Sequence, residues 1–532
     1  MSLPMRRVEA MSKFNTTATR AASGTGPIIS EQRPSGTTHE GGVGYARDVK
    51  SELFLLAVAN MVGEATFYEA ANGRDSRYTE LVRAVAVEDP DWTSRFLRWL
   101  RAGANMRSAS LVGGLEAARA MLAAGLPGGR QVVASVLQRA DEPGEALAYW
   151  TSRYGRKIPM PVKNGVADAA VRLYSERSLL KYDTVSKGWR FGDVIDMTHP
   201  KPAAPWQGDL FKVALDWRPC RDDVTVPGTL STLIANLQLR LDAVADPAVL
   251  LDPERLAEAG WTWENALSLA GGRVDKARLW EALIPSMGYM ALLRNLRNFD
   301  EAGVSDQVAD QVAVRLADPE QVAKSRQFPF RFYAAHSAVQ SLRWGNALEK
   351  ALRASLANVP ALPGRTLVLV DQSPSMFPGY GFSTAQQNRD ISNADLAKLF
   401  GAAVALRAAD ATLVGYGNTS ARVPFAKGEA VLRLMGKFQM IDGTDTFGAI
   451  AQHFDRHDRV VIVTDEQNQP GRYRTIDDVL PRTVPAYVWN IGGYQVGSTA
   501  SGRNRWTFGG LTDAGFQMIP LLEAGRDGEW PF

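Results

Sequence analysis

The stretch Thr366-Leu-Val-Leu-Val-Asp-Gln-Ser-Pro-Ser375 decides the fold of the C-terminal part of this chain. An apolar, β-branched run of this kind is typical of a buried strand in a parallel sheet. Asp371, Ser373 and Ser375 then stand at alternate positions on the loop after the strand. A carboxylate and two hydroxyls are hard oxygen ligands, which Mg²⁺ and Mn²⁺ prefer. The alternative is a Ser-Pro turn in which Asp and Ser bond only local backbone.

Two downstream segments favour the metal site over the simple turn. Thr444 lies in a Gly-Thr-Asp-Thr segment, and Arg459-Val-Val-Ile-Val-Thr-Asp465 is a second apolar strand that ends in a carboxylate. Sites in open parallel sheets form at the carboxyl ends of strands, where these residues would meet. The order Asp-x-Ser-x-Ser, then Thr, then Asp resembles the metal-ion-dependent adhesion site of von Willebrand factor type A domains. We therefore expect five residues to bind Mg²⁺ or Mn²⁺: Asp371, Ser373, Ser375, Thr444 and Asp465. An incoming acidic group would complete the coordination shell.

The sequence around these motifs predicts an α/β domain over residues 363–532. Apolar strands at 366–371, 411–417, 459–464 and about 486–491 alternate with helical segments near 393–409 and 445–454. This alternation is the signature of a parallel sheet that is covered by helices on both faces, the doubly wound, Rossmann-like arrangement. Residues 421–425 are predicted to add a short antiparallel edge strand.

Residues 43–362 show a helical pattern almost throughout. Leu111, Leu115, Ala118 and Leu122 mark one apolar face; Val308, Val312 and Leu316 mark another, with Ser305 as the expected N-cap. Short breaks with Gly, Pro and Asp separate many short amphipathic helices, which favours a solenoid-like stack of helix pairs. Residues 1–42 are rich in Ser, Thr, Gly and Pro, and we expect them to form a flexible N-terminal segment.

Composition and motifs exclude several classes of protein. Cys220 is the only cysteine of the 532 residues, which excludes intrachain disulfides and Cys-cluster zinc sites and fits a reducing, cytoplasmic location. The chain has no phosphate-binding P-loop, no G-x-S-x-G elbow and no Cys-His nucleophile pair. His453 and His457 have the spacing of a zinc helix but lack the adjacent Glu base, so we interpret them as a solvated helix end. We expect no catalytic residues and no enzymatic activity.

The formal net charge of +3 is nearly neutral, so any nucleic-acid surface must be local. Between residues 153 and 190, nine Lys and Arg side chains stand against Asp168, Glu176 and Asp183. Clustered cations favour nucleic-acid binding because neutralised phosphates release their counterions. Tyr174, Tyr182 and Trp189 are interleaved and could stack unpaired bases. The alternative is a solvated helical face with the aromatic rings packed in the core.

Several helical segments match one family in order. They are His39-Glu-Gly-Gly, Lys157-Ile-Pro-Met-Pro-Val-Lys-Asn-Gly, Leu180-Lys-Tyr, Gly188-Trp-Arg-Phe-Gly-Asp through His199-Pro, Met290-Ala-Leu-Leu-Arg-Asn-Leu-Arg-Asn-Phe299 and Pro329-Phe-Arg-Phe332. Together with the type A domain they resemble the TROVE-domain proteins, the Ro autoantigen of animals and its bacterial orthologues, over residues 40 to 525. The resemblance implies a ring of HEAT-like helical repeats with a type A domain. It also implies binding of Y RNA and of single-stranded 3′ ends of misfolded or immature noncoding RNA.

The resemblance extends to partners and to residues. It implies a scaffold for RNA quality control, degradation or ribosomal RNA maturation with exoribonucleases such as polynucleotide phosphorylase. Lys181 and His199 match basic positions that contact RNA in the family, although Asp183-Thr-Val-Ser replaces a more basic stretch between them. We therefore assign RNA binding to Lys163, Lys181, Lys187, Arg190, His199, Arg294 and Arg297.

Two alternatives stay open for these residues. His199 precedes Pro200, a setting in which a histidine often ends a helix through backbone bonds. Arg294 and Arg297 either line the hole of the ring or pair with acids.

Two functional hypotheses follow. The first is a monomeric RNA-binding scaffold without catalytic activity. The second is a protein-interaction module whose metal site captures a partner carboxylate, as an accessory of an ATP-driven chelatase or chaperone, without RNA binding. Retention of RNA binding in EDTA would favour the first hypothesis, and Mg²⁺-dependent capture of protein without RNA affinity would favour the second.

Overall fold

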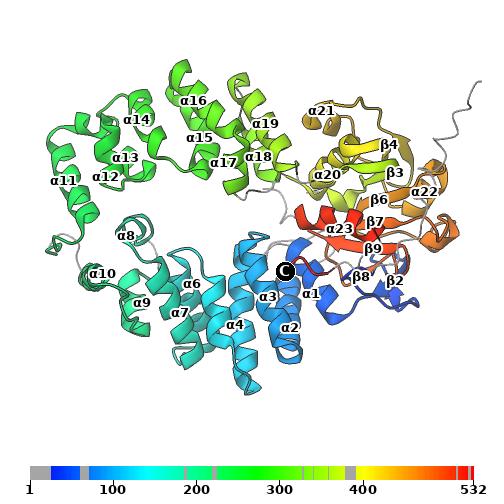
Figure 1. Cartoon of the computed structure of the whole chain (residues 1–532), viewed down its shortest axis with the longest axis horizontal. Helices are drawn as coiled ribbons and strands as arrows, with labels where there is room; N and C mark the ends of the chain where they lie inside the picture. The colour runs from blue at the N-terminus through cyan, green and yellow to red at the C-terminus, as the bar shows by residue number, and fades with distance from the viewer. Residues whose placement is uncertain are drawn as a thin grey trace, which may run out of the picture. The chain divides into compact units, whose positions relative to one another are not determined.

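The computed structural model describes residues 25–59, 71–184, 188–218, 224–325, 327, 329–339, 341–357, 359–377, 391–510, 513–524 and 529–532. The chain forms two compact units, one made of Met1–Leu81 with Leu356–Phe532 and the other of Val82–Ser355. The first is an α/β unit and the second is α-helical (Figure 1). The predicted fold class, helical repeats plus a doubly wound α/β domain, is confirmed. Within the described residues, no helix is long and apolar enough to cross a membrane.

The α/β unit is built on a six-stranded sheet with the order β5-β4-β3-β6-β7-β9. All neighbouring strands are parallel except β5, which pairs antiparallel with β4 at one edge. The strands predicted from the apolar runs are present, and the sequence analysis missed β9. The strand bounds are β3 Leu362–Asp371, β4 Ala408–Tyr416, β5 Ser420–Arg422, β6 Arg459–Thr464, β7 Ala486–Asn490 and β9 Arg505–Gly509.

Alternate residues of β3 contact different helices because successive side chains of a strand point to opposite faces. Leu367 and Leu369 share a core with Phe447 and Ile450 of α22 (Thr446–His453). On the other face, α20 (Asn393–Arg407) lies so close to the sheet that a Cβ atom at Gly401 would be 2.2 Å from Val370. Helices α22 and α20 therefore cover opposite faces of β3. Two further helices complete this part, α21 (Val431–Met435) and α23 (Asp513–Glu523).

The described N-terminal residues belong to the α/β unit. Strand β2 (Val43–Ala46) pairs with β1 (Gly36–Thr37) and with β8 (Val496–Gly497), and α1 (Val49–Ala59) packs on β9. A buried ion pair joins Arg47 to Glu466, whose side chains are 1% and 0% exposed. The predicted boundaries at residues 42/43 and 362/363 differ from this arrangement. Within residues 25–42, Ile28, Ser30 and Thr38 are buried and Gly36–Thr37 form β1, and residues 1–24 lie outside the described part of the chain.

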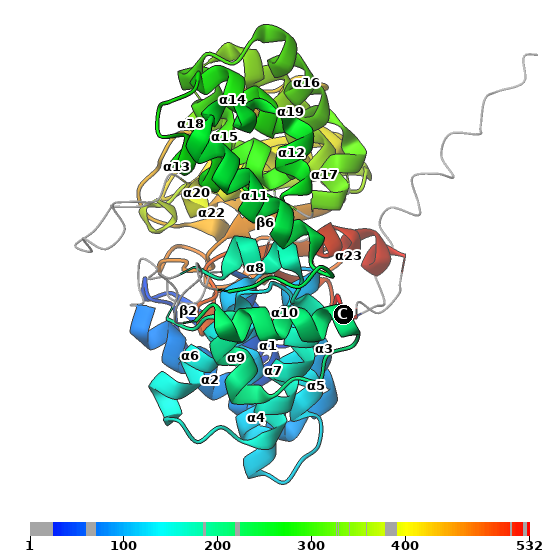
Figure 2. The same cartoon turned by 90° about the vertical axis from the view of Figure 1, so that its left-hand side faces the viewer.

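The helical unit consists of short helices in series, and neighbours such as α4 (Arg107–Ala123) and α5 (Gly129–Val136) pack against each other (Figures 1 and 2). Several begin at residues whose side chains bond the first backbone N–H groups, as Asp89 does before Pro90 and Ser175 does before Glu176. The bounds are α2 Ala71–Glu88 (shared with the first unit), α3 Pro90–Ala102, α4 Arg107–Ala123, α5 Gly129–Val136, α6 Glu142–Tyr154, α7 Met160–Leu173, α8 Glu176–Tyr182, α9 Phe191–Thr198, α10 Pro205–Asp216, α11 Ser231–Ala245, α12 Pro253–Glu258, α13 Trp263–Ala270, α14 Lys276–Leu283, α15 Tyr289–Ala302, α16 Asp306–Ala317, α17 Pro319–Ser325, α18 Pro329–Ala338 and α19 Gly345–Ser355.

The predicted apolar faces of two helices are largely buried. In α4, Leu111, Leu115 and Ala118 are buried, whereas Leu122 at the end of the face is 45% exposed. In α16, Val312 and Leu316 are buried and Ser305 is the N-cap residue, although its side chain makes no capping bond. Val308, near the start of α16, is only partly buried. The periodicity therefore locates the helices correctly and overestimates burial at Leu122 and Val308.

Candidate metal site and nucleic-acid interface

Asp371 and its two serines lie together at the carboxyl end of β3. Asp371 is fully buried; its Oδ1 accepts a hydrogen bond from the Ser373 backbone N–H at 2.9 Å. The Ser373 and Ser375 hydroxyl oxygens are 3.1 Å apart. On the neighbouring strand β6, the Thr464 hydroxyl donates to Asp371 Oδ2 at 2.6 Å. The sequence analysis missed Thr464, although the parallel pairing of Val370 with Val463 places the two strand ends side by side.

Asp465 is the second carboxylate of the site. Its residue is 1% exposed, Oδ1 accepts from the Gln467 backbone N–H at 3.2 Å, and Oδ2 has no hydrogen-bond partner among the described residues. Burial, together with the nearby charge of Asp371, raises the pKa of Asp465 to about 7, although the Ser375 hydroxyl acts in the opposite direction. Burial also raises the pKa of Asp371. Two carboxylates in one dry place are costly to ionise without a cation.

Thr444 belongs to a loop that is attached to the same end of the sheet. It is buried, and its carbonyl accepts from the Gln469 backbone N–H at 2.9 Å, four residues beyond Asp465. The neighbouring Asp445 donates its backbone N–H to the carbonyl of Gly417 at the end of β4 and caps α22 through its side chain. The structure thus brings the loops that carry all five predicted ligands to one edge of the sheet.

This set of side chains fits a hard divalent cation. Two buried carboxylates, one with an unpartnered oxygen, are accompanied by two serine hydroxyls and a threonine. Among the described residues, no group of three or more His, Cys, Asp and Glu side chains could hold a metal ion, and the candidate site combines two carboxylates with hydroxyls instead. The two carboxylates and the hydroxyls would hold Mg²⁺ or Mn²⁺, which would attract further oxygen ligands such as an acidic group.

The two histidines near this domain are not a solvated helix end. Both are buried, and α22 ends at His453, so the helical spacing does not extend to His457. His453 Nε2 lies 3.0 Å from the Ser420 hydroxyl, and His457 Nε2 lies 3.0 Å from the Thr412 hydroxyl. Burial lowers the pKa of each imidazole. They are structural hydrogen-bonding residues of the α/β unit.

The residues predicted to bind RNA have different surroundings in the helical unit. Lys181 is exposed, with its ammonium 5.1 Å from the centre of the Tyr182 ring, and Lys163 on α7 is partly exposed. No ion pair is found for either lysine within the described residues. Lys187 lies outside the described residues. Lys163 and Lys181 thus remain available for phosphate contacts.

Arg190 has a structural role instead of the predicted surface role. Its side chain is 12% exposed and forms an ion pair of 2.6 Å with Asp183, which is 1% exposed. Its remaining guanidinium nitrogen Nη1 donates to the carbonyls of Trp217 and Arg218, both at 3.1 Å. Because every nitrogen of the guanidinium is engaged inside the protein, Arg190 has none left for phosphate.

The other three predicted RNA-binding residues are His199, Arg294 and Arg297, for which the sequence left alternative roles open. His199 ends α9 in the left-handed region with φ of 49°, and its backbone N–H bonds the carbonyl of Ile195, as the helix-end interpretation expects. Its side chain is exposed. Arg297 pairs with Glu301 at 2.7 Å on the exposed side of α15, while Arg294 is exposed and has no ion pair within the described residues.

The aromatic residues of the basic stretch differ in burial. Tyr174 is a core residue, stacked on Phe191 with ring centres 3.8 Å apart, so the packing interpretation is correct for it. Trp189 lines a surface pocket of about 490 Å³ together with Arg156 and Arg218. The pocket also contains Asp193 and Asp196, which lie 3.4 and 3.2 Å from Arg218. Arg218 and the pocket itself had no signal in the local sequence.

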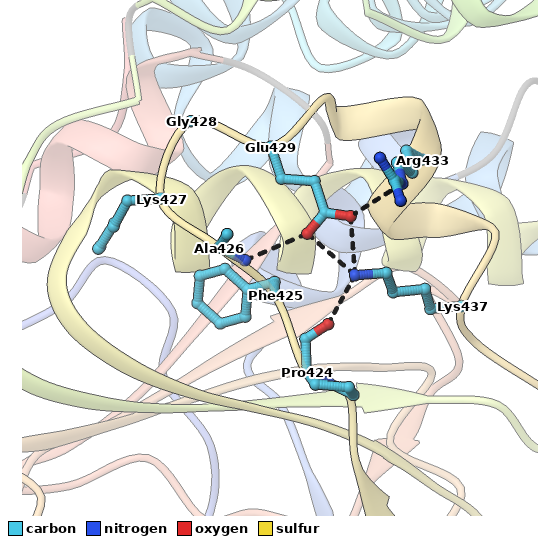
Figure 3. A pocket seen from close by; sticks show the side chains of 8 residues that line it. All are labelled: Pro424, Phe425, Ala426, Lys427, Gly428, Glu429, Arg433 and Lys437. Atoms are coloured by element: carbon cyan, nitrogen blue, oxygen red, sulfur yellow. Dashed lines mark hydrogen bonds and ion pairs between the residues drawn. The ribbon is translucent and has the colours of Figure 1, made fainter.

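A second surface pocket, of about 520 Å³, lies in the α/β unit around α21 (Figure 3). Three cationic side chains line the pocket, and each of them already contacts a residue of the pocket or of its surroundings. Lys437 contacts Glu429 and donates to the carbonyl of Pro424 at 2.8 Å, Arg433 lies 3.6 Å from Glu429, and Lys427 donates to the carbonyl of Ala408. These bonds hold the loop 424–429 in place, and we assign the pocket no ligand.

Comparisons with known proteins agree with this architecture. Residues 256–353, from α12 to α19, match the family model of the TROVE domain. A segment of 83 residues is 45% identical to "Telomerase protein component 1" of Mus musculus and of Rattus norvegicus. The segment makes up 15% of this chain and spans only 3% of each of these relatives. The crystal structure of the Deinococcus radiodurans RO (RSR) protein matches with a TM-score of 0.57 at 18% identity, over 89% of this chain and 100% of that chain.

Residues 256–353 of the chain are similar to the TROVE domain, and the chain shares its fold with the Ro protein. The family match lies in the second half of the helical unit, around Arg294 and Arg297. The basic stretch 153–190 and the metal-site candidate lie outside the matched residues, so their roles depend on the geometry described above.

Proposed function

We propose that this protein binds RNA through its helical unit and acts without catalytic chemistry of its own. The observation that carries the proposal is a group of cations in the basic stretch whose side chains have neither a carboxylate nor a carbonyl partner among the described residues. They are Arg156, Lys157, Lys163 and Lys181. Free cations attract phosphates because binding releases condensed counterions, whereas cations already paired with carboxylates gain little.

The finer part of the proposal concerns the form of RNA. We propose that the helical repeats form a ring which accepts a single-stranded 3′ end of misfolded or immature noncoding RNA, while structured Y RNA contacts the basic stretch. A strand fits where an A-form duplex, with its larger diameter and its fixed grooves, does not. In this proposal the protein is a cytoplasmic monomer that presents noncoding or ribosomal precursor RNA to exoribonucleases such as polynucleotide phosphorylase.

Binding of matched RNA hairpins tests this proposal. One hairpin carries a 3′ tail, one carries the same tail at the 5′ end, and one is blunt; affinities are measured at several salt concentrations, with and without EDTA. We expect the 3′-tailed hairpin to bind most tightly in EDTA as well, because the lysines and arginines that contact phosphate are not ligands of the metal. Equal affinity for all three would leave only nonspecific electrostatics and contradict the proposal.

A second function is favoured by the fit of the α/β unit to a divalent cation. Mg²⁺ or Mn²⁺ held by Asp371, Ser373, Ser375, Thr444 and Asp465 would bind an acidic group, as an adhesion-type site does. We propose that this site recognises a carboxylate and carries out no hydrolysis, because two hydroxyls and two ligand carboxylates leave no general base. Mg²⁺-dependent capture of an acidic peptide, abolished by Asp371→Ala, is the test; metal-independent capture would contradict it.

A further inference from the structure

The surface pocket beside Trp189 lies where three helices of the helical unit meet. Helix α9 packs against both α6 and α10 (Figure 1), and residues of all three helices or of the chain next to them line the pocket. Its volume of about 490 Å³ falls within the range of about 300–1,000 Å³ that is usual for sites of small molecules. We call this cavity the Trp189 pocket.

Two glycines allow close packing around the Trp189 pocket. A Cβ atom added at Gly144 of α6 would lie 3.0 Å from the carbonyl oxygen of Trp189 and 3.2 Å from its Cβ. A Cβ atom added at Gly192 of α9 would lie 2.6 Å from Cγ of Arg218. Because glycine has no side chain, the backbone of Trp189 and the stem of Arg218 can lie directly on these helices. Helix packing therefore positions both residues.

Hydrogen-bonding groups of the pocket remain open to a ligand. Asp193 and Asp196 are three residues apart on α9, and both contact Nη1 of Arg218, at 3.4 and 3.2 Å. Asp193 also accepts from the backbone N–H of Arg190 at 2.9 Å. The side chain of Asp196 is 63% exposed, and in the described part of the chain its Oδ1 has no partner. Nε and Nη2 of Arg218 likewise have none there, so the pocket offers an acceptor next to donors.

The lining suits a nucleobase better than a free anion. Arg156 and Arg218 balance the charges of Asp193 and Asp196, so the pocket has no net positive charge to hold an isolated phosphate. Trp189 is partly exposed and adds an aromatic surface. Proteins that bind single-stranded RNA stack unpaired bases on such rings and read their edges by hydrogen bonds.

Guanine matches the hydrogen-bonding groups of the pocket. A carboxylate only accepts hydrogen bonds, and guanine presents two adjacent donors, N1–H and the N2 amino group, on its Watson–Crick edge. Adenine and cytosine have a ring acceptor beside their amino group, and uracil has a carbonyl on each side of its N–H, so each would direct a lone pair at the carboxylate. The O6 acceptor of guanine lies next to N1–H, where an arginine beside the carboxylate can donate to it.

We propose that the Trp189 pocket binds an unpaired guanine of RNA. The base stacks on Trp189, its N1–H and N2 amino group donate to Asp196, its O6 accepts from Arg218, and its phosphate contacts Arg156. The inference rests on the proposed binding of RNA by the helical unit and adds a base preference to it. Phosphate contacts position an RNA without reading its sequence, whereas this pocket discriminates between bases.

RNA hairpins that differ in a single bulged nucleotide test this assignment. The stem and a 3′ tail stay constant, the bulge is G, A, C or U, and binding to the full-length protein is measured by fluorescence anisotropy. We expect the guanine hairpin to bind at least about fivefold more tightly than the other three, because one bidentate contact to a base edge discriminates by about 5- to 150-fold.

Two aspartate variants locate the preference. Asp196→Asn should lose it, because the amide cannot accept two hydrogen bonds from guanine side by side. Asp216→Asn is the matched control: Asp216 is an exposed residue of α10 that does not line the pocket, so its substitution removes the same charge and should keep the preference. Both substitutions are at exposed positions, and circular dichroism checks that the variants fold as the wild type does.

The outcomes distinguish the pocket from the wider function. Equal affinity of the wild type for the four hairpins would overturn the guanine assignment and leave RNA binding by the helical unit intact. A guanine preference that survives in Asp196→Asn would also overturn it. Failure of every hairpin to bind would overturn the proposed RNA function itself.

Competition with GMP and AMP identifies the source of the base. GMP should displace the guanine hairpin better than AMP does, but only at concentrations far above that of the hairpin, because it lacks the other phosphate contacts. Displacement by GMP at the concentration of the hairpin would show that the pocket takes a free nucleotide, and would overturn the assignment to RNA.

Discussion

Replacing Arg190 with alanine should destabilise the helical unit without removing a side chain that contacts RNA. In the folded protein Arg190 lies 2.6 Å from Asp183, and their side chains are 12% and 1% exposed. The substitution would leave the Asp183 carboxylate buried without its guanidinium, although the backbone N–H of Phe191 would still donate to it at 2.8 Å. Removal of one partner from a buried ion pair costs about 3–5 kcal/mol, because the other charge stays buried without compensation. The carbonyls of Trp217 and Arg218 would also be deprived of the Arg190 donor.

Hydrogen exchange at the backbone amides of α9 and urea denaturation would measure this destabilisation. We expect protection of residues 191–198 to fall by about two orders of magnitude or more, which corresponds to about 3 kcal/mol. The double variant Asp183→Asn with Arg190→Met, which removes both charges, should recover part of the stability. The control is Lys181→Ala, whose side chain is exposed and should change stability by no more than about 0.5 kcal/mol.

Measurements of RNA binding distinguish a structural role of Arg190 from a role as a phosphate contact. If Arg190→Ala unfolds no more readily than the wild type, yet weakens RNA binding and flattens its salt dependence, then Arg190 is a phosphate contact. That result would refute the reasoning from burial and hydrogen bonding. Measurements well below the unfolding transition keep the two effects apart.

Three further predictions concern the metal, the lysines and the buried histidines. Asp371→Ala should abolish the stabilisation of the protein against heat by Mg²⁺ or Mn²⁺ and retain RNA affinity; a full metal-induced shift in this variant would exclude Asp371 as a ligand. Combined replacement of Arg156, Lys163 and Lys181 by alanine should flatten the plot of log affinity against log salt by up to about one unit for each phosphate that is no longer neutralised, and an unchanged slope in the folded variant would exclude this surface. Burial lowers the pKa of His457 in the folded protein. Below the ordinary histidine pKa of about 6.5, the unfolded state therefore takes up a proton more readily and the stability of the protein falls with falling pH. In urea denaturation, His457→Gln should lose less stability than the wild type between about pH 7.5 and 5, and an unchanged pH profile would show that His457 does not contribute.

The sheet, and the meeting of the candidate ligands' loops at its carboxyl end, were predictable because their signals are local. Each apolar run of β3 and β6 ends in a carboxylate, and parallel neighbours bring such ends together without any further information. Thr464 follows from the same logic once the register of the two strands is known. The bond of Thr38 to Asn468 does not, because 430 residues separate the two in the sequence and only the folding of the N-terminal loop onto the sheet brings them together.

The same separation explains the domain boundaries. The apolar run of α1 resembles the first helix of a repeat array, and its packing on β9 depends on strand β2 pairing with β8. Pairing over such distances leaves no local pattern. Likewise, composition cannot distinguish Arg190 from a surface cation. Asp183, which pairs with Arg190, lowers the net positive charge of the stretch, but this does not reveal that both side chains are buried.

The structure also limits how strongly the basic stretch can bind RNA. Its arginines mostly join helices: Arg172 donates to the carbonyl of Ala134 at 2.9 Å, Arg177 to that of Ala257 at 2.9 Å, and Arg190 to Asp183. The planar guanidinium suits such fixed acceptors, whereas the flexible ammonium of lysine remains in solvent as a point charge. Four of the nine cations, Arg156, Lys157, Lys163 and Lys181, have no acid or carbonyl partner within the described residues. At about 0.7–0.9 units per neutralised phosphate, these four account for a salt slope of about 3–4, less than half of what the composition alone suggests. A much steeper measured slope would therefore locate further phosphate contacts elsewhere in the chain, with Arg294 on α15 as the first position to test.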